Sequence, residues 1–434
     1  MIDYMNYLLQ VKDEESSELI RFAIENLMDS DGEFRLEMSE AGLSHLYLYH
    51  DLGDITPFLI NLGEEQLIKN LLSKVDNLVR RDGGLVSGSL TFGRFKGFSK
   101  SYEYTDFLLG LEDCYRSLHT PQSKNILLSQ VKHAEKIFKF GNKHSSYYSN
   151  RFRVSIPIVD TRDIMFIEIY CDLSESLESE IFLSNAVNQF HYFRELRKSD
   201  SYGLLPDFQM NRLLIKLLGY KPNYTLMKNH TNALHAYIRL YDKTKDSEIL
   251  LEIEDLVDLI TKHFQRGDGS FSDTIRVEDP EASLKASFAM IEFFVEYQLV
   301  TGDNRYEGKA LDIVQFWEDR LGSTGLFPMS SGTTSSFIDS QTDMVISLWR
   351  LGALAQNHNV VTLGDKAFYG LREFHGKNRF PLNVDVNTGL VLDNTIRTKF
   401  VFLYLKALIA LKIRNTNLNL LNTDNELRRL LRDR

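Results

Sequence analysis

Residues 250–271 read LLEIEDLVDLITKHFQRGDGSF, and residues 283–300 read SLKASFAMIEFFVEYQLV. The first stretch spaces its apolar residues as an amphipathic helix does, and this helix is expected to end at the glycine-containing turn 265–271. Glycine tolerates the positive φ of a helix C-cap, and Phe271 is expected to pack back under the turn. The second stretch is apolar on nearly every side, so we expect a buried helix. Together they predict one helical hairpin.

The same arrangement recurs along the chain. Glycine-containing turns followed by an apolar or aromatic residue end at Phe34, Leu85, Phe327 and Phe380, and related turns lie near Gly203 and Gly141. The turns repeat roughly every fifty to sixty-odd residues, which is enough for two helices and two connections.

Each turn is followed by a helix richer in apolar residues than the helix before it. These second helices are expected at 43–52, 104–118, 163–173, 232–241, 283–300, 342–355 and 398–413. This difference in apolar content predicts an outer ring of partly exposed helices around an inner ring of buried ones. Long alternating β-branched runs are absent, so strands should be short and confined to loops. The predicted fold is all-α, an α/α toroid formed as a closed ring of six to seven helical hairpins. An open helical solenoid is the alternative.

This pattern resembles the six-hairpin glycosidase-like superfamily and its neighbours, the sugar 2-epimerases and α/α-barrel polysaccharide lyases, over nearly the whole chain. The turns 265–271 and 81–85 are also similar to those of terpene cyclases and protein prenyltransferases, which share the toroid. The chain has neither an Asp-x-Asp-Asp acid motif nor the Asp, Cys and His set of a prenyltransferase zinc site. The resemblance therefore implies fold class more strongly than chemistry.

Composition narrows the classes of partner. The 434 residues carry a net charge of −10, which excludes a global basic field for nucleic acid. The N-terminal stretch lacks the pattern of a secretory signal, and no run is long and apolar enough for a membrane span, which favours a cytoplasmic protein without a membrane partner. Cys114 and Cys171 stand alone, so no zinc site is expected. We predict no metal and no cofactor.

Domain organisation follows from the repeat. Only eight prolines occur, and no Pro-rich or Ser-rich linker interrupts the turns. The sequence therefore predicts one toroid domain over residues 1–434. It makes no prediction about oligomeric state.

Closing the ring would bring the N-terminal ends of the inner helices together at one mouth, so candidate site residues are sought there. Asp339 and Asp343 are four apart and should share one helix face. Close carboxylates push one pKa upward and provide an acid for glycosidic oxygen. Alternatively, Asp339 caps its helix and Asp343 is solvated or paired with a cation.

A second acidic pair, Glu103 and Asp106, lies beside Tyr102 and Tyr104, whose rings could stack on a sugar. Alternatively, such acids complement the helix dipole. Inverting glycosidases take acid and base from different elements. We therefore expect Asp106 or Asp163 to act with Asp339 or Asp343, and Gln341 to contact substrate.

Histidines and cations complete the candidate set. His230 and His235 are five apart, which does not fit a helical metal pair, but either could move a proton as in the sugar epimerases that the chain resembles. A structural role for both is the alternative. Arg162, Lys285 and Arg397 begin three different inner helices and would suit the carboxylate or sulfate of an acidic sugar. Alternatively, Lys285 pairs with Glu281.

The leading functional hypothesis is a carbohydrate-active enzyme: a glycoside hydrolase that acts on an acidic oligosaccharide with paired carboxylates. The first alternative is a sugar epimerase or polysaccharide lyase that uses His235, His230 or Tyr104. The second is a terpene-cyclase-like or non-catalytic binding toroid.

Overall fold

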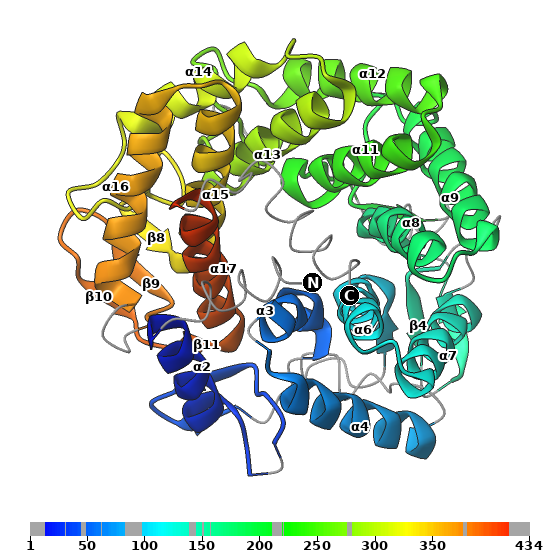
Figure 1. Ribbon diagram of the computed structural model, residues 1–434. Coiled ribbons are helices and arrows are strands. Elements are labelled where there is room, and N and C mark those ends of the chain that lie inside the picture. Colours follow the sequence, from blue (N-terminus) through cyan, green and yellow to red (C-terminus); the bar gives the residue numbers. More distant parts are fainter. Residues whose placement is uncertain are drawn as a thin grey trace.

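The computed structural model describes residues 14–415, with gaps at 31, 45–48, 62, 83–97, 139–144, 150–151, 157, 211–218, 220, 276–279 and 376–379. Helices alternate between an outer and an inner ring around a common axis (Figure 1). The outer helices are α2 (Glu14–Leu27), α4 (Glu65–Asp82), α7 (Pro121–Phe138), α9 (Glu180–Lys198), α12 (Ser247–Phe264), α14 (Glu307–Glu318) and α16 (His358–His375).

The inner ring follows the apolar stretches of the sequence. It comprises α3 (Thr56–Asn61), α6 (Ser101–Leu118), α8 (Phe166–Ser176), α11 (Asn232–Thr244), α13 (Leu284–Thr301), α15 (Ile338–Leu354) and α17 (Thr398–Asn415). Short one-turn helices precede three of them: η1 (Tyr49–Asp54), η3 (Thr161–Met165) and the π-helical η4 (Leu226–Thr231). The described residues thus form seven hairpins, which confirms the all-α toroid.

Contacts between the first and last hairpins close the ring. Strand β1 (Glu37–Ser39) pairs with β11 (Ile396–Arg397). On the outer side, Glu15 of α2 accepts hydrogen bonds from Arg372 at 2.9 Å and from the Tyr404 hydroxyl at 3.2 Å. These bonds join residues more than three hundred positions apart in sequence. An open solenoid is therefore excluded.

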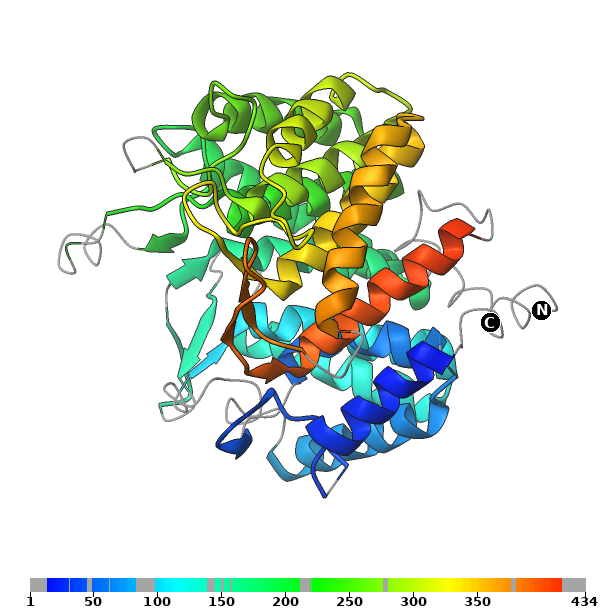
Figure 2. The same ribbon diagram turned by 90° about the vertical axis from the view of Figure 1, so that its left-hand side faces the viewer.

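Short antiparallel strands occupy the rim at which the inner helices begin (Figure 2). Each has two or three residues: β2 (Gly42–Leu43) beside β1; β3 (Phe98–Lys100), β4 (Tyr147–Ser149) and β5 (Val154–Ile156); β6 (Ile158–Asp160) with β7 (Phe208–Met210); and β8 (Ser335–Phe337), β9 (Asn383–Asp385) and β10 (Val391–Asp393). The prediction of short strands in loops is confirmed.

The turn after α12 has the predicted geometry. Gly269 has φ +85°, and Asp268 accepts a hydrogen bond from the backbone N–H of Ser270 at 3.1 Å. Phe271 is fully buried, as are Phe327 and Phe380 after their own turns. The turns predicted at Leu85 and Gly141 lie outside the described residues.

The first inner segment differs from its prediction. A continuous helix was expected over 43–52, but Leu43 ends strand β2 and residues Tyr49–Asp54 form a short 3₁₀ helix, with residues 45–48 outside the described part of the chain. Asp51 has non-helical angles (φ −107°, ψ 23°), and Gly53 follows it. A Cβ on Gly53 would lie 2.9 Å from the carbonyl oxygen of Asp106, so contact with α6 dictates this local backbone.

None of the described helices combines the length and apolarity needed to cross a membrane.

Candidate active site at the ring axis

Inner helices α15 and α17 each carry a stripe of charged residues that are only half-buried. Within residues 338–352 of α15, all side chains are buried except those of Asp339 and Asp343. Within residues 398–410 of α17, the same holds for Lys399 and Lys406. Outer helices and neighbouring inner helices cover the remaining faces, so these stripes face the ring axis (Figure 1). Half-buried charged residues continue around the ring: Asp106 on α6, Glu168 on α8, His235 on α11, and Lys285, Glu292 and Glu296 on α13.

These groups interact electrostatically around the whole ring. Asp106 is influenced by Asp54 of η1 and by Glu168, and Glu168 also influences His235. The chain of interactions returns to Asp54 on the other side: Glu292 of α13 acts on both His235 and Asp343, and Asp54 acts on Asp343. Groups from six inner segments therefore form one electrostatic network.

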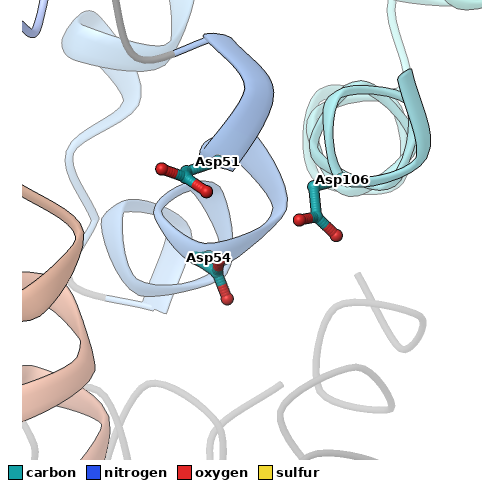
Figure 3. Close-up of side chains that lie close together, drawn as sticks. All are labelled: Asp51, Asp54 and Asp106. Atoms are coloured by element: carbon teal, nitrogen blue, oxygen red, sulfur yellow. The ribbon is translucent and has the colours of Figure 1, made fainter. Parts of the chain in front are cut away.

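Asp51, Asp54 and Asp106 form the densest part of this network. One carboxylate oxygen of each lies within 4.8 Å of the others, and Figure 3 shows Asp51 and Asp54 of η1 beside Asp106 of α6. The spacing would suit a cation, but the Lys399 ammonium already lies 2.5 Å from Asp54 Oδ2 and 3.5 Å from Asp51 Oδ1. A metal ion would have to displace this ion pair.

Two glycines allow this crowding. A Cβ on Gly53 would meet the Asp106 backbone, and a Cβ on Gly110 would lie 2.6 Å from Leu52 Cγ. Sequence analysis did not select Asp51 or Asp54. The sequence does contain a pattern that could have indicated them: residues 49–54, YHDLGD, place two acids three residues apart at the end of an apolar run.

Two axial carboxyl groups have pKa values near neutrality. Burial, reinforced by Asp54, raises the pKa of Asp106 to about 8, against the opposing influence of Lys399. Burial also raises the pKa of Asp343 to about 7, with Lys406 opposing and Glu292 assisting. Burial therefore favours the protonated forms of both carboxyl groups near neutral pH.

Asp339 lies in a different environment from Asp343. Its Oδ2 is 3.0 Å from Lys285 Nζ, and its Oδ1 accepts from the backbone N–H of Ser340 at 2.7 Å. It is therefore an ion-paired residue within the first turn of α15. Lys285 was expected to pair with Glu281 as an alternative, but Glu281 precedes α13 and accepts instead from the Ser330 hydroxyl.

The two histidines lie in different environments. His235 Nδ1 lies 2.7 Å from Glu296 Oε2 at the axis. Burial favours the neutral ring, but Glu296 and Glu292 outweigh it and raise the pKa of His235 to about 9. His230 is fully buried: its Nε2 accepts from the Leu205 N–H, its Nδ1 bonds the Thr225 carbonyl, and burial lowers its pKa to about 4. His230 is therefore structural and not a substrate ligand.

Three further predicted site residues are buried in the core and do not face the ring axis. Tyr104 is 1% exposed and packs edge-on against Phe138, so it cannot stack on a sugar. Asp163 is fully buried and accepts hydrogen bonds from Ser101 and Ser146.

Gln341 is also buried. It accepts from the Phe327 N–H at 2.9 Å and donates to the Phe327 carbonyl at 2.8 Å, which fixes the turn before β8. The polar groups of Asp163 and Gln341 therefore form hydrogen bonds within the core.

Tyr102, Glu103 and Arg162 meet at the rim between α6 and α8. The Arg162 guanidinium lies 3.3 Å from the centre of the Tyr102 ring and pairs with Asp160 at 2.5 Å. Burial raises the pKa of Glu103 to about 7, although Lys100 lies 3.4 Å from its Oε1. One face of Tyr102 is thus covered by Arg162.

The three cations proposed for an acidic sugar all have carboxylate partners. Arg162 pairs with Asp160, Lys285 with Asp339, and Arg397 with Glu37 at 3.3 Å. Arg397 also lies over the ring of Phe400.

No protein-family model matches the sequence, and no curated protein matches it. Solved structures do match this chain in their fold. A sugar epimerase from a ruminal bacterium is 11% identical, with 96% of this chain and 100% of that chain covered at TM-score 0.57. A D-mannose isomerase is 9% identical (93% and 96% covered, TM-score 0.61), and an unsaturated glucuronyl hydrolase specific for heparin is 11% identical (96% and 99% covered, TM-score 0.53). The chain therefore shares the α/α-toroid fold of these proteins.

Proposed function

We propose that the protein is a carbohydrate-active enzyme, and specifically a glycoside hydrolase, in which Asp106 is the general acid and Asp343 the general base. The observation that carries this proposal is the position of two carboxyl groups, on α6 and α15, that face the ring axis with pKa values near neutrality. Among the similar structures, a glucuronyl hydrolase and two family 76 glycoside hydrolases support hydrolysis on this fold.

The proposed reaction uses both protonation states at once. Asp106 donates its proton to the glycosidic oxygen as the bond to the sugar breaks, and ionised Asp343 accepts a proton from the attacking water. Helices α6 and α15 are not neighbours in the ring (Figure 1). We expect inversion of the anomeric centre, which requires about 6.5–9.5 Å between the two carboxyl groups so that the attacking water fits on the face of the sugar opposite the leaving group.

The charge of the sugar remains a prediction. An acidic oligosaccharide was expected because Arg162, Lys285 and Arg397 begin inner helices, but its carboxylate would have to compete with Asp160, Asp339 and Glu37 for them. A substrate panel should therefore contain neutral and uronate-bearing oligosaccharides of the same linkage.

A sugar epimerase is the second candidate, because His235 faces the axis and epimerases share the fold. An imidazolium with a pKa of about 9 can donate a proton but cannot accept one at pH 7, which favours the hydrolase.

The two candidates are separated by incubating the oligosaccharide panel in D₂O. Hydrolysis creates new reducing ends without deuterium in the sugar carbon skeleton. Epimerisation creates no reducing end and introduces deuterium next to the carbonyl carbon. We expect the first result, and Asp242→Asn, on the exposed end of α11, serves as the control variant. Deuterium incorporation that is lost in His235→Ala would establish the epimerase instead.

A further inference from the structure

An ammonium group from the last hairpin of the ring reaches the carboxylates of the first two. We propose that Lys399 is a positioning residue that holds Asp54 and Asp51 beside Asp106 and thereby sets the pH at which Asp106 gives up its proton. This inference deepens the proposed function, since it concerns the group assigned there as the general acid.

The geometry places Lys399 at the seam where the ring closes. Lys399 is the second residue of α17, and its side chain is 31% exposed. It forms an ion pair with Asp54 at 2.5 Å and lies 3.5 Å from Asp51. The positive charge of Lys399, in the seventh hairpin, therefore lies against η1 of the first hairpin. Segment η1 in turn packs on α6 of the second hairpin.

The backbone leaves the carboxylates little freedom to move apart. Gly53 lies between Asp51 and Asp54 and lacks the Cβ that would collide with the Asp106 carbonyl oxygen. Gly110 similarly lets Leu52 approach α6. Because like charges at this separation repel, a cation beside Asp51 and Asp54 stabilises the cluster. Lys399 supplies that cation from within the chain.

The charges around Asp106 come from three elements besides its own helix. Asp54 and Asp51 of η1 and Glu168 of α8 favour its protonated form, whereas Lys399 of α17 favours the carboxylate. When the proton passes from Asp106 to the glycosidic oxygen, the new carboxylate is therefore stabilised by Lys399 and opposed by the three acids. Lys399 makes the donation easier without contacting the sugar.

The same helix offers a matched control. Lys406 lies seven residues further along the same stripe of α17, but it acts on Asp343. Replacing either lysine by glutamine removes one charge from the axis at the same helix face. If position matters and net charge does not, only Lys399→Gln will change the titration of Asp106.

The experiment is a ¹³C NMR titration of the full chain labelled at aspartate Cγ, with the Asp106 resonance identified by its loss in Asp106→Asn. We expect Lys399→Gln to raise the pKa of Asp106 by about one unit, since an adjacent opposite charge typically lowers a carboxyl pKa by one to three units. Lys399→Arg should keep it within about 0.3 units of wild type because the charge is retained. Lys406→Gln should leave Asp106 unchanged and raise the pKa of Asp343.

Asp51→Asn provides a readout of opposite sign: removing a like charge should lower the pKa of Asp106, and this variant keeps the Lys399–Asp54 pair. An unchanged or lower pKa of Asp106 in folded Lys399→Gln, or equal shifts in the Lys399→Gln and Lys406→Gln variants, would overturn the inference. The titration needs no substrate. A protein that hydrolyses no glycoside but shows the expected shifts would refute the proposed function and leave the role of Lys399 intact.

Discussion

Asp106, Asp339 and Asp343 all face the ring axis, but their immediate partners give them different chemistry. Asp339 is held in the first turn of α15 by Lys285 and by the Ser340 N–H. Asp106 and Asp343 lie deeper among other acids, and both have raised pKa values. Environment, and not residue type, therefore separates a structural aspartate from two candidate catalysts.

The first prediction concerns pH. The active form requires Asp343 without its proton and Asp106 with its proton, so activity should fall below the Asp343 pKa of about 7 and above the Asp106 pKa of about 8. The pH profile of kcat/KM should therefore be bell-shaped and narrow, with its maximum between these values. A broad maximum near pH 5 would contradict the assignment of both carboxyl groups.

The second prediction concerns His235. Glu296→Gln removes a carboxylate that raises the His235 pKa, so the pKa should fall, as measured by NMR of the imidazole C–H protons. Because the pKa is raised in the folded protein, the Glu296 pair stabilises the fold below about pH 6.5 and this stabilisation is lost as the pH rises to about 9. The stability difference between wild type and variant should shrink over that window. A constant difference would contradict the coupling.

Sequence reasoning found some axial residues and could not reject others, for a geometric reason. Polar residues were selected because they lie in the first turns of inner helices, but successive residues of a helix differ by about 100° in direction. Tyr102 and Asp106 share the axial stripe of α6, whereas Tyr104 lies on its buried side. The rotation of a helix within a ring depends on its packing partners, which one sequence does not specify.

At the scale of elements, the contact between η1 and α6 creates the densest charge cluster. Gly53 and Gly110 set the distance between these segments. The apolar run before Asp51 predicted a regular helix, because local spacing carries no information about a neighbouring helix that crowds the backbone. Fold class was predictable from the repeated turns, and this irregular element was not.

The third prediction tests that contact. Gly110→Ala would place a Cβ 2.6 Å from Leu52 Cγ and 2.7 Å from the Leu52 backbone, so η1 must move away. We expect a loss of about 1–3 kcal/mol in the free energy of unfolding, as is typical for overpacking. Urea denaturation measures it. Gly308→Ala in α14 is the control, since a Cβ there meets nothing within 4 Å, and it should be neutral or slightly stabilising. Equal effects of the two substitutions would show that the η1–α6 contact is loose.

At the scale of the whole molecule, closure joins hairpins at opposite ends of the chain. Glu15 takes hydrogen bonds from Arg372 and Tyr404, and strands β1 and β11 pair on the strand-bearing rim. The repeat predicted a ring, and its closing contacts could not be derived from sequence because they join residues of unrelated local pattern. One domain over residues 1–434 remains a prediction from the absence of linkers.

The fourth prediction concerns cooperativity. A closed ring should unfold in one transition, and Glu15→Ala should lower the free energy of unfolding by about 1–3 kcal/mol because the buried Tyr404 hydroxyl loses its partner. Glu14→Ala, at an exposed position on the same helix, should change it by less than about 0.5 kcal/mol. Differential scanning calorimetry measures both. Two separate transitions in wild type would contradict a single domain.

The most direct test of the proposed mechanism compares Asp106→Asn and Asp343→Asn on two substrates of the same sugar: a natural-type glycoside with a poor leaving group and a dinitrophenyl glycoside with a good one. A good leaving group needs no protonation, so Asp106→Asn should lose at least about a hundredfold in kcat on the first substrate and little on the second. Asp343→Asn should lose activity on both. If Asp106→Asn retains full activity on the poor leaving group, Asp106 is not the general acid and the account is wrong.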